Sequence, residues 1–294
     1  MASQSIRAGL LLACFFWAIS FIATKIALKD VPPLMVVTLR LLFSALCFLP
    51  LLYRRRGVIH ISGTGHVLRL FVFSLFGSSL HYGIQTAGIQ YTTASNASLW
   101  AMTCPVSITL IAALFLGERV TLKKAAGIML AIGGVMVVLG PDFFRGVEFR
   151  SHLLGDGLVF LSIFLWALFT VYGKRLSAET GALELIAIAM VIGSLTMIPA
   201  GIWEMRSTGF SFVQVTWRAW AAIAFLGVTC GFIANLLYFL ALGRMESQKV
   251  GVYLYIIPPM TYVAAAIMLH ETIGFGLITG SVLVMAGVYM TERG

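Results

Sequence analysis

The chain has 294 residues, of which 60% are hydrophobic and only 11% are charged, and its formal net charge is +9. Soluble domains carry roughly 25% charged residues, so this composition and the mean hydropathy of +0.98 exclude a soluble fold and require lipid as the outer solvent. The basic residues lie in short clusters between apolar runs, which excludes a nucleic-acid-binding face and indicates membrane topology instead.

Long apolar runs recur along the whole chain. Each is about 20 residues long, the length that one helix needs to cross a bilayer, whereas barrel strands would be short and alternating. We therefore predict an all-α integral membrane protein with ten transmembrane helices. The predicted spans cover residues 8–28, 34–53, 67–89, 94–116, 122–140, 154–174, 182–203, 217–242, 247–269 and 273–291. The loops are short and hold no GxxxxGK[ST] motif, so we expect no nucleotide-binding domain.

The basic residues also predict an orientation. With the N-terminus in the cytoplasm, thirteen Lys and Arg fall on the inner side and five on the outer side. This bias favours an orientation with both termini in the cytoplasm. Lys25 and Arg40 lie near the outer ends of the first two spans. We expect their side chains to reach the interface, and the alternative is that they attract a carboxylate.

The third and fourth spans carry polar and aromatic side chains that point to a solute cavity. His81 and Gln85 lie four residues apart on one face of the third span, beside Tyr82. Asn96 and Trp100 share a face of the fourth span. Polar groups without partners are costly in hydrocarbon, so these faces should contact either a solute or another helix through a hydrogen bond.

The two halves of the chain repeat one another. FFWAISFIATK at 15–25 matches FLWALFTVYGK at 164–174, and a block around Pro105 returns around Pro258 at a shift of 153. We predict five-helix repeats at 1–145 and 146–294. An odd number of spans inverts the second repeat, and inverted repeats place a central cavity near the midplane that opens to either side in turn.

The repeat extends the candidate site into the second half. It pairs Trp17 with Trp166 and Trp100 with Tyr253, and aromatic pairs of this kind form either a stacking wall for a solute or ordinary helix packing. The candidate substrate-binding residues are Trp17, His81, Tyr82, Gln85, Asn96, Trp100, Trp166, Asn235, Tyr238 and Tyr253. A few polar groups in an aromatic pocket suit a small amphipathic ligand.

Pro105 and Pro258 interrupt the fourth and ninth spans at equivalent depth. Proline removes a backbone hydrogen bond, so we predict gating hinges there, with a static kink as the alternative. Gly127 and Ala131 form a small-xxx-small pair that permits close helix contact, chiefly within one chain.

Acidic residues lie only in the loops or near the ends of the predicted spans. This placement argues against proton-driven antiport, because proton-coupled carriers place a titratable group at the midplane, where His81 is the one candidate. Glu118 and Glu271 fall at span ends, where we expect structural ion pairs. The four cysteines lack metal-ligand or disulfide spacing, so we predict neither a metal nor a cofactor.

With these motifs the chain resembles the drug/metabolite transporter superfamily, in its ten-helix branch with two EamA-type halves. The resemblance is carried by FxWAxxxxxxK opening each half and by AALFLGERVT and AAIMLHETIG. It implies a transporter of amino acids or related metabolites that lies in the lipid bilayer of a bacterial inner membrane, binds no nucleic acid and functions as a monomer. Within the branch the chain is most similar to bacterial aromatic amino acid exporters.

Three other readings stay open on the sequence. One is a nucleotide-sugar or drug carrier on the same scaffold; a midplane basic cluster for phosphate would favour the nucleotide-sugar carrier, and the sequence shows none. An intramembrane enzyme would need a catalytic pair such as Ser/Lys within the spans, and the sequence shows none, so we do not expect an enzyme. A non-transporting membrane assembly subunit would have no uptake activity.

Overall fold

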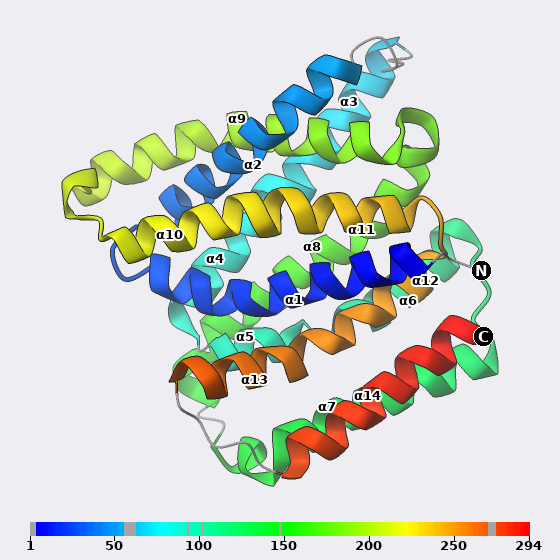
Figure 1. Cartoon of the computed structure of the whole chain (residues 1–294). Coiled ribbons are helices and arrows are strands. Elements are labelled where there is room, and N and C mark those ends of the chain that lie inside the picture. Colours follow the sequence, from blue (N-terminus) through cyan, green and yellow to red (C-terminus); the bar gives the residue numbers. More distant parts are fainter. Residues whose placement is uncertain (1–3, 56–62, 93, 102, 147–148, 270–274) are drawn as a thin grey trace.

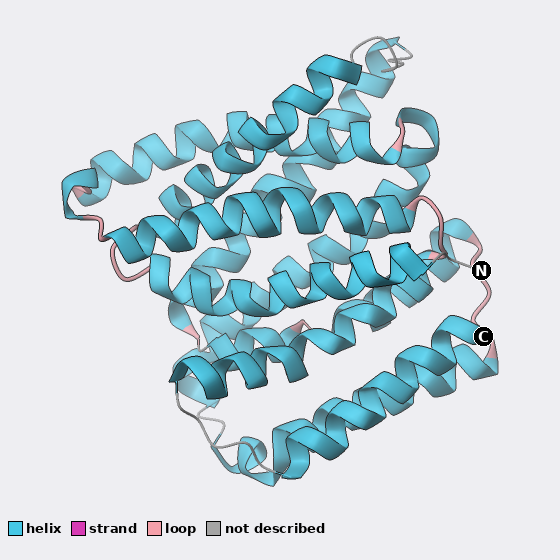
Figure 2. Cartoon of the chain, in the orientation of Figure 1, coloured by secondary structure: helices cyan, strands magenta, loops and turns pink. Residues whose placement is uncertain are grey.

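A computed structural model describes residues 4–55, 63–92, 94–101, 103–146, 149–269 and 275–294 (Figure 1). In these ranges every regular element is a helix, and no strand occurs (Figure 2). Six helical runs in the described part are long and apolar enough to cross a membrane. They are Gln4–Ala27, Pro33–Arg55, Gly63–Tyr91, Leu154–Thr180, Ala182–Thr208 and Trp217–Leu242. The prediction of an all-α membrane protein is therefore confirmed, whereas the count of ten spans and the inverted repeat stay predictions.

The first half of the chain folds into helices that follow the predicted spans. They are α1 (Gln4–Ala27), α2 (Pro33–Arg55), α3 (Gly63–Ser74), the π-helix η1 (Leu75–Leu80), α4 (His81–Tyr91), α5 (Ala94–Trp100), α6 (Thr103–Leu116) and α7 (Leu122–Gly146). The predicted fourth span is thus divided into α5 and α6. Pro105 lies in the first turn of α6, where its missing N–H is tolerated, so the irregular backbone precedes the proline.

The second half contains the corresponding elements. They are α8 (Phe149–Thr180), α9 (Ala182–Thr208), the 3₁₀ turn η2 (Phe212–Gln214), α10 (Trp217–Phe225), the π-helix η3 (Leu226–Ala234), α11 (Asn235–Leu242), α12 (Ser247–Val252), the 3₁₀ turn η4 (Tyr253–Ile256), α13 (Ile257–Leu269) and α14 (Phe275–Arg293). The predicted ninth span is divided in the same way, by η4 directly before Pro258. The interruptions of the fourth and ninth spans were predicted from the prolines, whereas the π-helices within the third and eighth spans were not.

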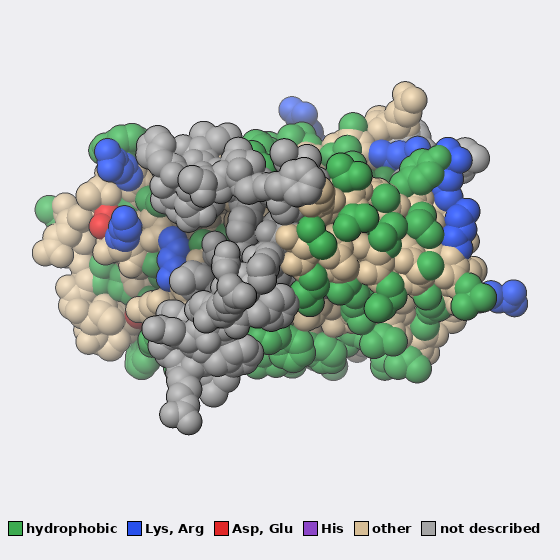
Figure 3. All heavy atoms as spheres, turned by 90° about the horizontal axis from the view of Figure 1, so that it is seen from below, with side chains coloured by type: hydrophobic (Ala, Val, Ile, Leu, Met, Phe, Trp, Pro, Cys, Tyr) green, Lys and Arg blue, Asp and Glu red, His purple; other side chains and the backbone are tan. Residues whose placement is uncertain are grey.

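The helices pack as a bundle that carries large apolar side chains on its outer surface as well as in its core. Leu114 is 80% exposed and Phe115 is 70% exposed, which suits contact with lipid. On the face seen in Figure 3, hydrophobic side chains cover much of the described surface between the two ends, and Lys and Arg gather toward those ends. The core between the helices holds stacked aromatic rings, such as Phe73 and Phe169 with centroids 4.2 Å apart.

Two helix pairs pack closely along their lengths, α2 against α9 and α7 against α14 (Figure 1). Small residues allow the second contact, because a Cβ added at Gly287 would lie 2.8 Å from the Cβ of Ala131. A Cβ added at Gly127 would lie 2.8 Å from the carbonyl oxygen of Gly287. The predicted contact of Gly127 and Ala131 is thus found within one chain.

The two termini lie at the same end of the bundle, which we call the terminal end (Figure 1). The loops at the opposite end are tied across the two halves. Asp30, in the loop after α1, accepts a hydrogen bond of 3.0 Å from the backbone N–H of Thr216. Thr216 is also the N-cap of α10, since its hydroxyl accepts from Ala219 N–H at 3.3 Å. α9 ends nearby at Gly209, whose φ of 66° is one that glycine adopts readily.

Candidate functional site

A cavity lies among helices of both halves, with about 500 Å³ of space free of protein atoms, including the part that is open to solvent. It is lined by Trp17, Ser20, Phe21, Arg40, His81, Tyr82, Gln85, Ala101, Cys104, Ile163, Trp166, Leu254 and Ile257. These residues come from α1, α2, α4, α6, α8, η4 and α13, together with the break before α6.

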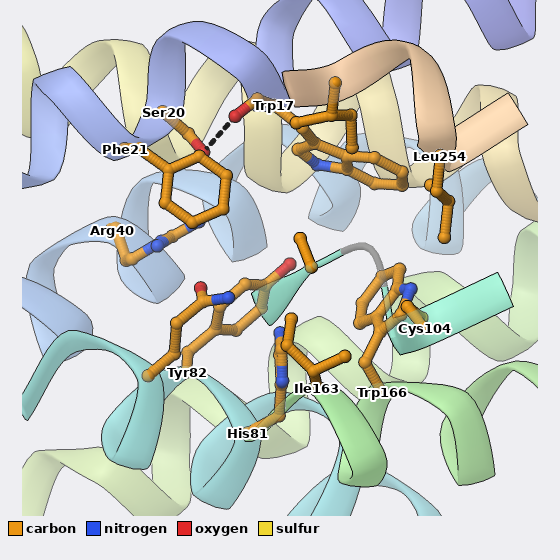
Figure 4. A pocket seen from close by; sticks show the side chains of 13 residues that line it. Trp17, Ser20, Phe21, Arg40, His81, Tyr82, Cys104, Ile163, Trp166 and Leu254 are labelled. Atoms are coloured by element: carbon orange, nitrogen blue, oxygen red, sulfur yellow. Dashed lines mark hydrogen bonds between the residues drawn. The ribbon is translucent and has the colours of Figure 1, made fainter. Parts of the chain in front are cut away.

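Two tryptophans from the equivalent helices α1 and α8 form the aromatic wall of the cavity. The ring centroids of Trp17 and Trp166 are 5.3 Å apart at an interplanar angle of 82°. Figure 4 shows their side chains converging from opposite sides of the cavity. Tyr238 packs behind both rings, at 5.2 Å from Trp17 and 5.6 Å from Trp166. The predicted pairing of the two tryptophans therefore brings them together in one wall.

His81 projects from the start of α4 toward Trp166, with ring centroids 5.1 Å apart. Its Nδ1 lies 2.7 Å from the carbonyl oxygen of Ser162 on α8. A carbonyl oxygen can only accept, so Nδ1 carries the hydrogen of this bond. A neutral ring then has Nε2 as a hydrogen-bond acceptor for a solute. The interhelical bond and the cavity position, which the sequence offered as alternatives, occur together.

Tyr82, the neighbour of His81, is held by a hydrogen bond across the two halves. Asn235 Nδ2 donates to the Tyr82 hydroxyl at 3.1 Å and to the carbonyl oxygens of Cys230 and Gly231 at 3.0 Å each. These carbonyls belong to the π-helix η3. The ring of Tyr82 in turn lies 4.2 Å below the guanidinium carbon of Arg40.

Two smaller polar groups complete the lining. The Ser20 hydroxyl donates to the carbonyl oxygen of Trp17 at 2.6 Å, which is drawn in Figure 4. The Gln85 amide has no hydrogen-bond partner among the residues that the structure describes. An amide carries two donors and an acceptor, so Gln85 can orient a polar group of a solute.

Several predicted site residues lie outside the lining. Asn235 and Tyr238 are fully buried behind it, where they fix Tyr82 and the two tryptophans. Trp100 packs on Phe160 with centroids 5.6 Å apart, and Tyr253 is buried in η4, where its carbonyl accepts from Cys14. The side chain of Asn96 lies outside the described residues, as does Glu271, for which an ion pair was expected. Direct solute contact of Asn96, Trp100, Asn235, Tyr238 and Tyr253 stays a prediction.

The predicted hinge prolines lie next to the cavity, because the residue four positions before each proline lines it. Pro105 cannot donate to Ala101, and Pro258 cannot donate to Leu254. Each of these carbonyls accepts an i+3 bond instead, from Cys104 N–H at 3.1 Å in the first half and from Ile257 N–H in the second. Ala101 and Leu254 both line the cavity. The breaks thus lie in the cavity wall, which suits a hinge.

For Arg40 the sequence favoured a side chain that reaches the interface, with attraction of a carboxylate as the alternative, and Arg40 was not among the predicted cavity residues. Its side chain is 3% exposed and reaches from α2 to the Tyr82 ring (Figure 4), so it does not extend to the interface as we expected. A charged residue within a span was itself the signal, because such residues usually mark solute pathways.

A larger groove between η1, α6 and α8 is a weaker candidate. Its lining is almost wholly apolar, and Phe76 and Phe115 in it are exposed on the outer surface. Such a surface suits lipid, whereas the smaller cavity has convergent polar groups.

At the terminal end, Glu118 joins the two halves. Its carboxylate accepts from the backbone N–H of Ser247 at 2.9 Å and of Gln248 at 3.2 Å, and lies 3.0 Å from the ammonium of Lys174. Lys174 also donates to the carbonyl oxygen of Met245 at 2.7 Å.

Burial raises the pKa of the Glu118 carboxyl, but its hydrogen bonds and the ammonium outweigh burial and hold the pKa below its ordinary value. The predicted ion pair at Glu118 is confirmed.

Comparison with known proteins agrees with this architecture. The chain matches the model of the EamA-like transporter family over residues 6–140 and again over 153–293. An uncharacterized transporter of Archaeoglobus fulgidus is 32% identical over 96% of this chain and 95% of its own length. The uncharacterized transporter YvbV of Bacillus subtilis is 29% identical, covering 97% of this chain and 92% of its own.

Two further likenesses are more distant. An Escherichia coli protein named as a probable amino-acid metabolite efflux pump is 24% identical over 97% of this chain and 93% of its own length. A solved structure, described only as the crystal structure of a protein, superposes with a TM-score of 0.80 at 17% identity. The superposition covers 99% of this chain and 98% of that one, and it shows a shared fold.

Proposed function

The chain belongs to the EamA-like transporter family, and on this premise we propose that it exports or exchanges small amphipathic metabolites, chiefly amino acids with aromatic or other apolar side chains. The observation that carries the proposal is the cavity walled by Trp17 and Trp166, with His81 and Gln85 in its lining. Aromatic walls take the apolar side chain, and the polar groups orient the backbone groups of the solute. The name of the distant Escherichia coli relative fits this solute class.

The proposed architecture is ten transmembrane helices in two inverted five-helix repeats around this cavity. Pairs of contacts that occur twice with the halves exchanged support it. α4 contacts α8 as α11 contacts α1, α6 contacts α8 as α13 contacts α1, and α2 contacts η3 as α9 contacts η1. Such a pattern is expected when a pseudo-two-fold axis relates the repeats, and it favours alternating access around a central site.

We place the terminal end in the cytoplasm of a bacterial inner membrane. The excess of basic residues in the loops at that end supports this orientation. In the present conformation the Glu118 contacts join the halves at the terminal end, so we assign it to the state closed toward the cytoplasm. Hinge motion at the breaks before Pro105 and Pro258 would then open it.

The test is counterflow in liposomes containing the purified protein. Labelled phenylalanine should exchange against unlabelled aromatic and apolar amino acids, but not against nucleotide sugars or cationic dyes, and a pH gradient should leave the rate unchanged. Trp166→Ala removes a buried aromatic ring from the cavity wall, and we expect the loss of apolar contact to weaken solute binding by about 1.5–3 kcal/mol. This corresponds to roughly a 10- to 100-fold higher half-saturating concentration.

The matched control is Trp203→Ala, because Trp203 is 66% exposed on α9 and does not line the cavity. It should leave exchange unchanged. Absence of counterflow with every amino acid would reject the proposed function, and equal rates in Trp166→Ala and wild type would reject the site.

A further inference from the structure

Arg40 carries a positive charge inside the bundle. It is the eighth residue of α2 (Pro33–Arg55), about 10 Å from the start of the helix at a rise of roughly 1.5 Å per residue. The side chain is 3% exposed and lines the cavity. An arginine that reached the interface would be exposed at the helix end, so this side chain is directed inward.

The charge has no anionic partner in the described part of the chain. Its one recorded close contact is the Tyr82 ring, 4.2 Å from the guanidinium carbon. No Asp or Glu occurs among the lining residues of the cavity that the structure describes. An ion pair that would merely hold the helices together is therefore absent from the described contacts of Arg40.

An arginine held this way is costly to the folded protein. A charged side chain at the centre of a membrane helix is disfavoured, and such residues usually pair or line a solute pathway. A cation–π contact offsets part of the cost, since a desolvated pair contributes more than an exposed one. The remainder is offset when an anion enters the cavity.

The geometry favours a flat, bidentate anion. A guanidinium that lies over an aromatic ring presents its N–H groups around the edge of its plane, because the ring occupies only one face. A carboxylate matches two parallel N–H donors of arginine. Ser20 and Gln85 line the same cavity, and Figure 4 shows Arg40 beside Ser20, Phe21 and Tyr82.

From this arrangement we infer that Arg40 binds the carboxylate of the transported solute, an assignment that rests on the proposed function and names its substrate class. The class is amphipathic carboxylic acids whose apolar part packs against the wall that Trp17 and Trp166 form. With no acidic group in the described lining, the carboxylate is the part of the solute that the protein recognises by charge. Esters and decarboxylated amines of the same skeleton lack it.

The experiment measures counterflow of labelled phenylalanine against unlabelled phenylalanine, its methyl ester and phenethylamine. Wild type should prefer the acid over the ester at least tenfold in half-saturating concentration. Arg40→Gln should abolish this preference, with the loss confined to the acid, and Arg40→Lys should retain part of it because a point charge remains.

Lys25→Gln is the matched control. Lys25 is a second cation at the same end of the bundle, in the last turn of α1, but it does not line the cavity. It should keep the full preference for the acid. A merely structural effect of Arg40→Gln would weaken the acid and the ester alike and leave their ratio unchanged.

The outcomes separate the two proposals. Wild-type exchange of phenylalanine with no preference for acid over ester would overturn the role of Arg40 while the transport function stands. An unchanged ratio in Arg40→Gln would do the same. If Arg40→Gln does not fold, the ratio in wild type and in Arg40→Lys still decides. No exchange of any amino acid or derivative would overturn both.

Discussion

At the scale of single residues, Asn235 shows how a buried amide can organise a site without lining it. Its Nδ2 group lies within 3.0–3.1 Å of three acceptors, the Tyr82 hydroxyl and two carbonyls of η3. A π-helix lacks regular i→i+4 bonds, so side chains can satisfy its carbonyls. Asn235 thereby fixes the Tyr82 ring, and the ring in turn supports the guanidinium of Arg40.

Substitutions at Tyr82 separate the contribution of the ring from that of the hydroxyl. Tyr82→Phe removes one interhelical hydrogen bond, worth about 0.6 kcal/mol in membranes and hence roughly a threefold weaker half-saturation. Tyr82→Leu also removes the cation–π contact of Arg40, worth about 2 kcal/mol when desolvated, or roughly 30-fold. Half-saturating concentrations of phenylalanine in counterflow measure both. Equal losses in the two variants would show that the hydroxyl, and not the ring, matters.

The sequence predicted some site residues better than others for a physical reason. Trp17 and Trp166 could be paired because a duplication aligns them, and His81 and Gln85 because a helix places them on one face. The direction of the Arg40 side chain could not be predicted. A long flexible side chain near a helix end can extend either way, and its direction depends on Tyr82, a residue of another helix.

At the scale of elements, the irregular turns occupy matching places in the two halves. η1 and η3 lie within the third and eighth predicted spans, and the breaks before α6 and within η4 lie in the fourth and ninth. Hydropathy windows predicted where spans occur, because they sum apolar side chains. They do not detect the change from i→i+4 to i→i+5 hydrogen bonds in a π-helix. Only the breaks in the fourth and ninth spans, which prolines mark, therefore had a signal in the sequence.

The contact of α7 with α14 gives a prediction for neighbouring glycines. A Cβ at Gly134 would lie 2.6 Å from the backbone nitrogen of Val284, whereas a Cβ at Gly133 would meet nothing within 4 Å. Gly134→Ala should destabilise the protein by about 1–3 kcal/mol, because the two backbones must separate. Gly133→Ala should be neutral or stabilise it by up to about 1 kcal/mol. Thermal unfolding in detergent compares them, and equal midpoints would contradict the close packing of α7 on α14.

At the scale of the whole molecule, the two halves meet through contacts at both ends of the bundle and through the cavity between them. Asp30 contacts Thr216 at one end, and Glu118 contacts Ser247 and Lys174 at the other. The alternating access that we propose would require one of these sets to break while the other stays formed. The contacts at the terminal end depend on the partly buried carboxylate of Glu118. Removing its charge should therefore shift the balance between the state closed at this end and the state open there.

Glu118→Gln keeps the shape of the side chain but removes the charge that Lys174 and two backbone N–H groups share. We expect faster hydrogen exchange at Ser247 and Gln248, measured on peptides that cover the start of α12. The matched control is Glu179→Gln. It removes an ion pair with Arg69 whose side chains are 40% and 44% exposed, and such pairs contribute little.

The pH dependence follows from the lowered pKa of Glu118. A carboxyl whose pKa is lower in the folded state stabilises that state fully above its ordinary pKa of 4.5, and the stabilisation disappears as the pH falls through the lowered value. The difference in unfolding midpoint between wild type and Glu118→Gln should thus be constant from pH 8 to about pH 5 and shrink only in stronger acid. A difference that vanishes near neutral pH, or slow exchange of Ser247 in Glu118→Gln, would mean that these contacts do not hold the terminal end closed.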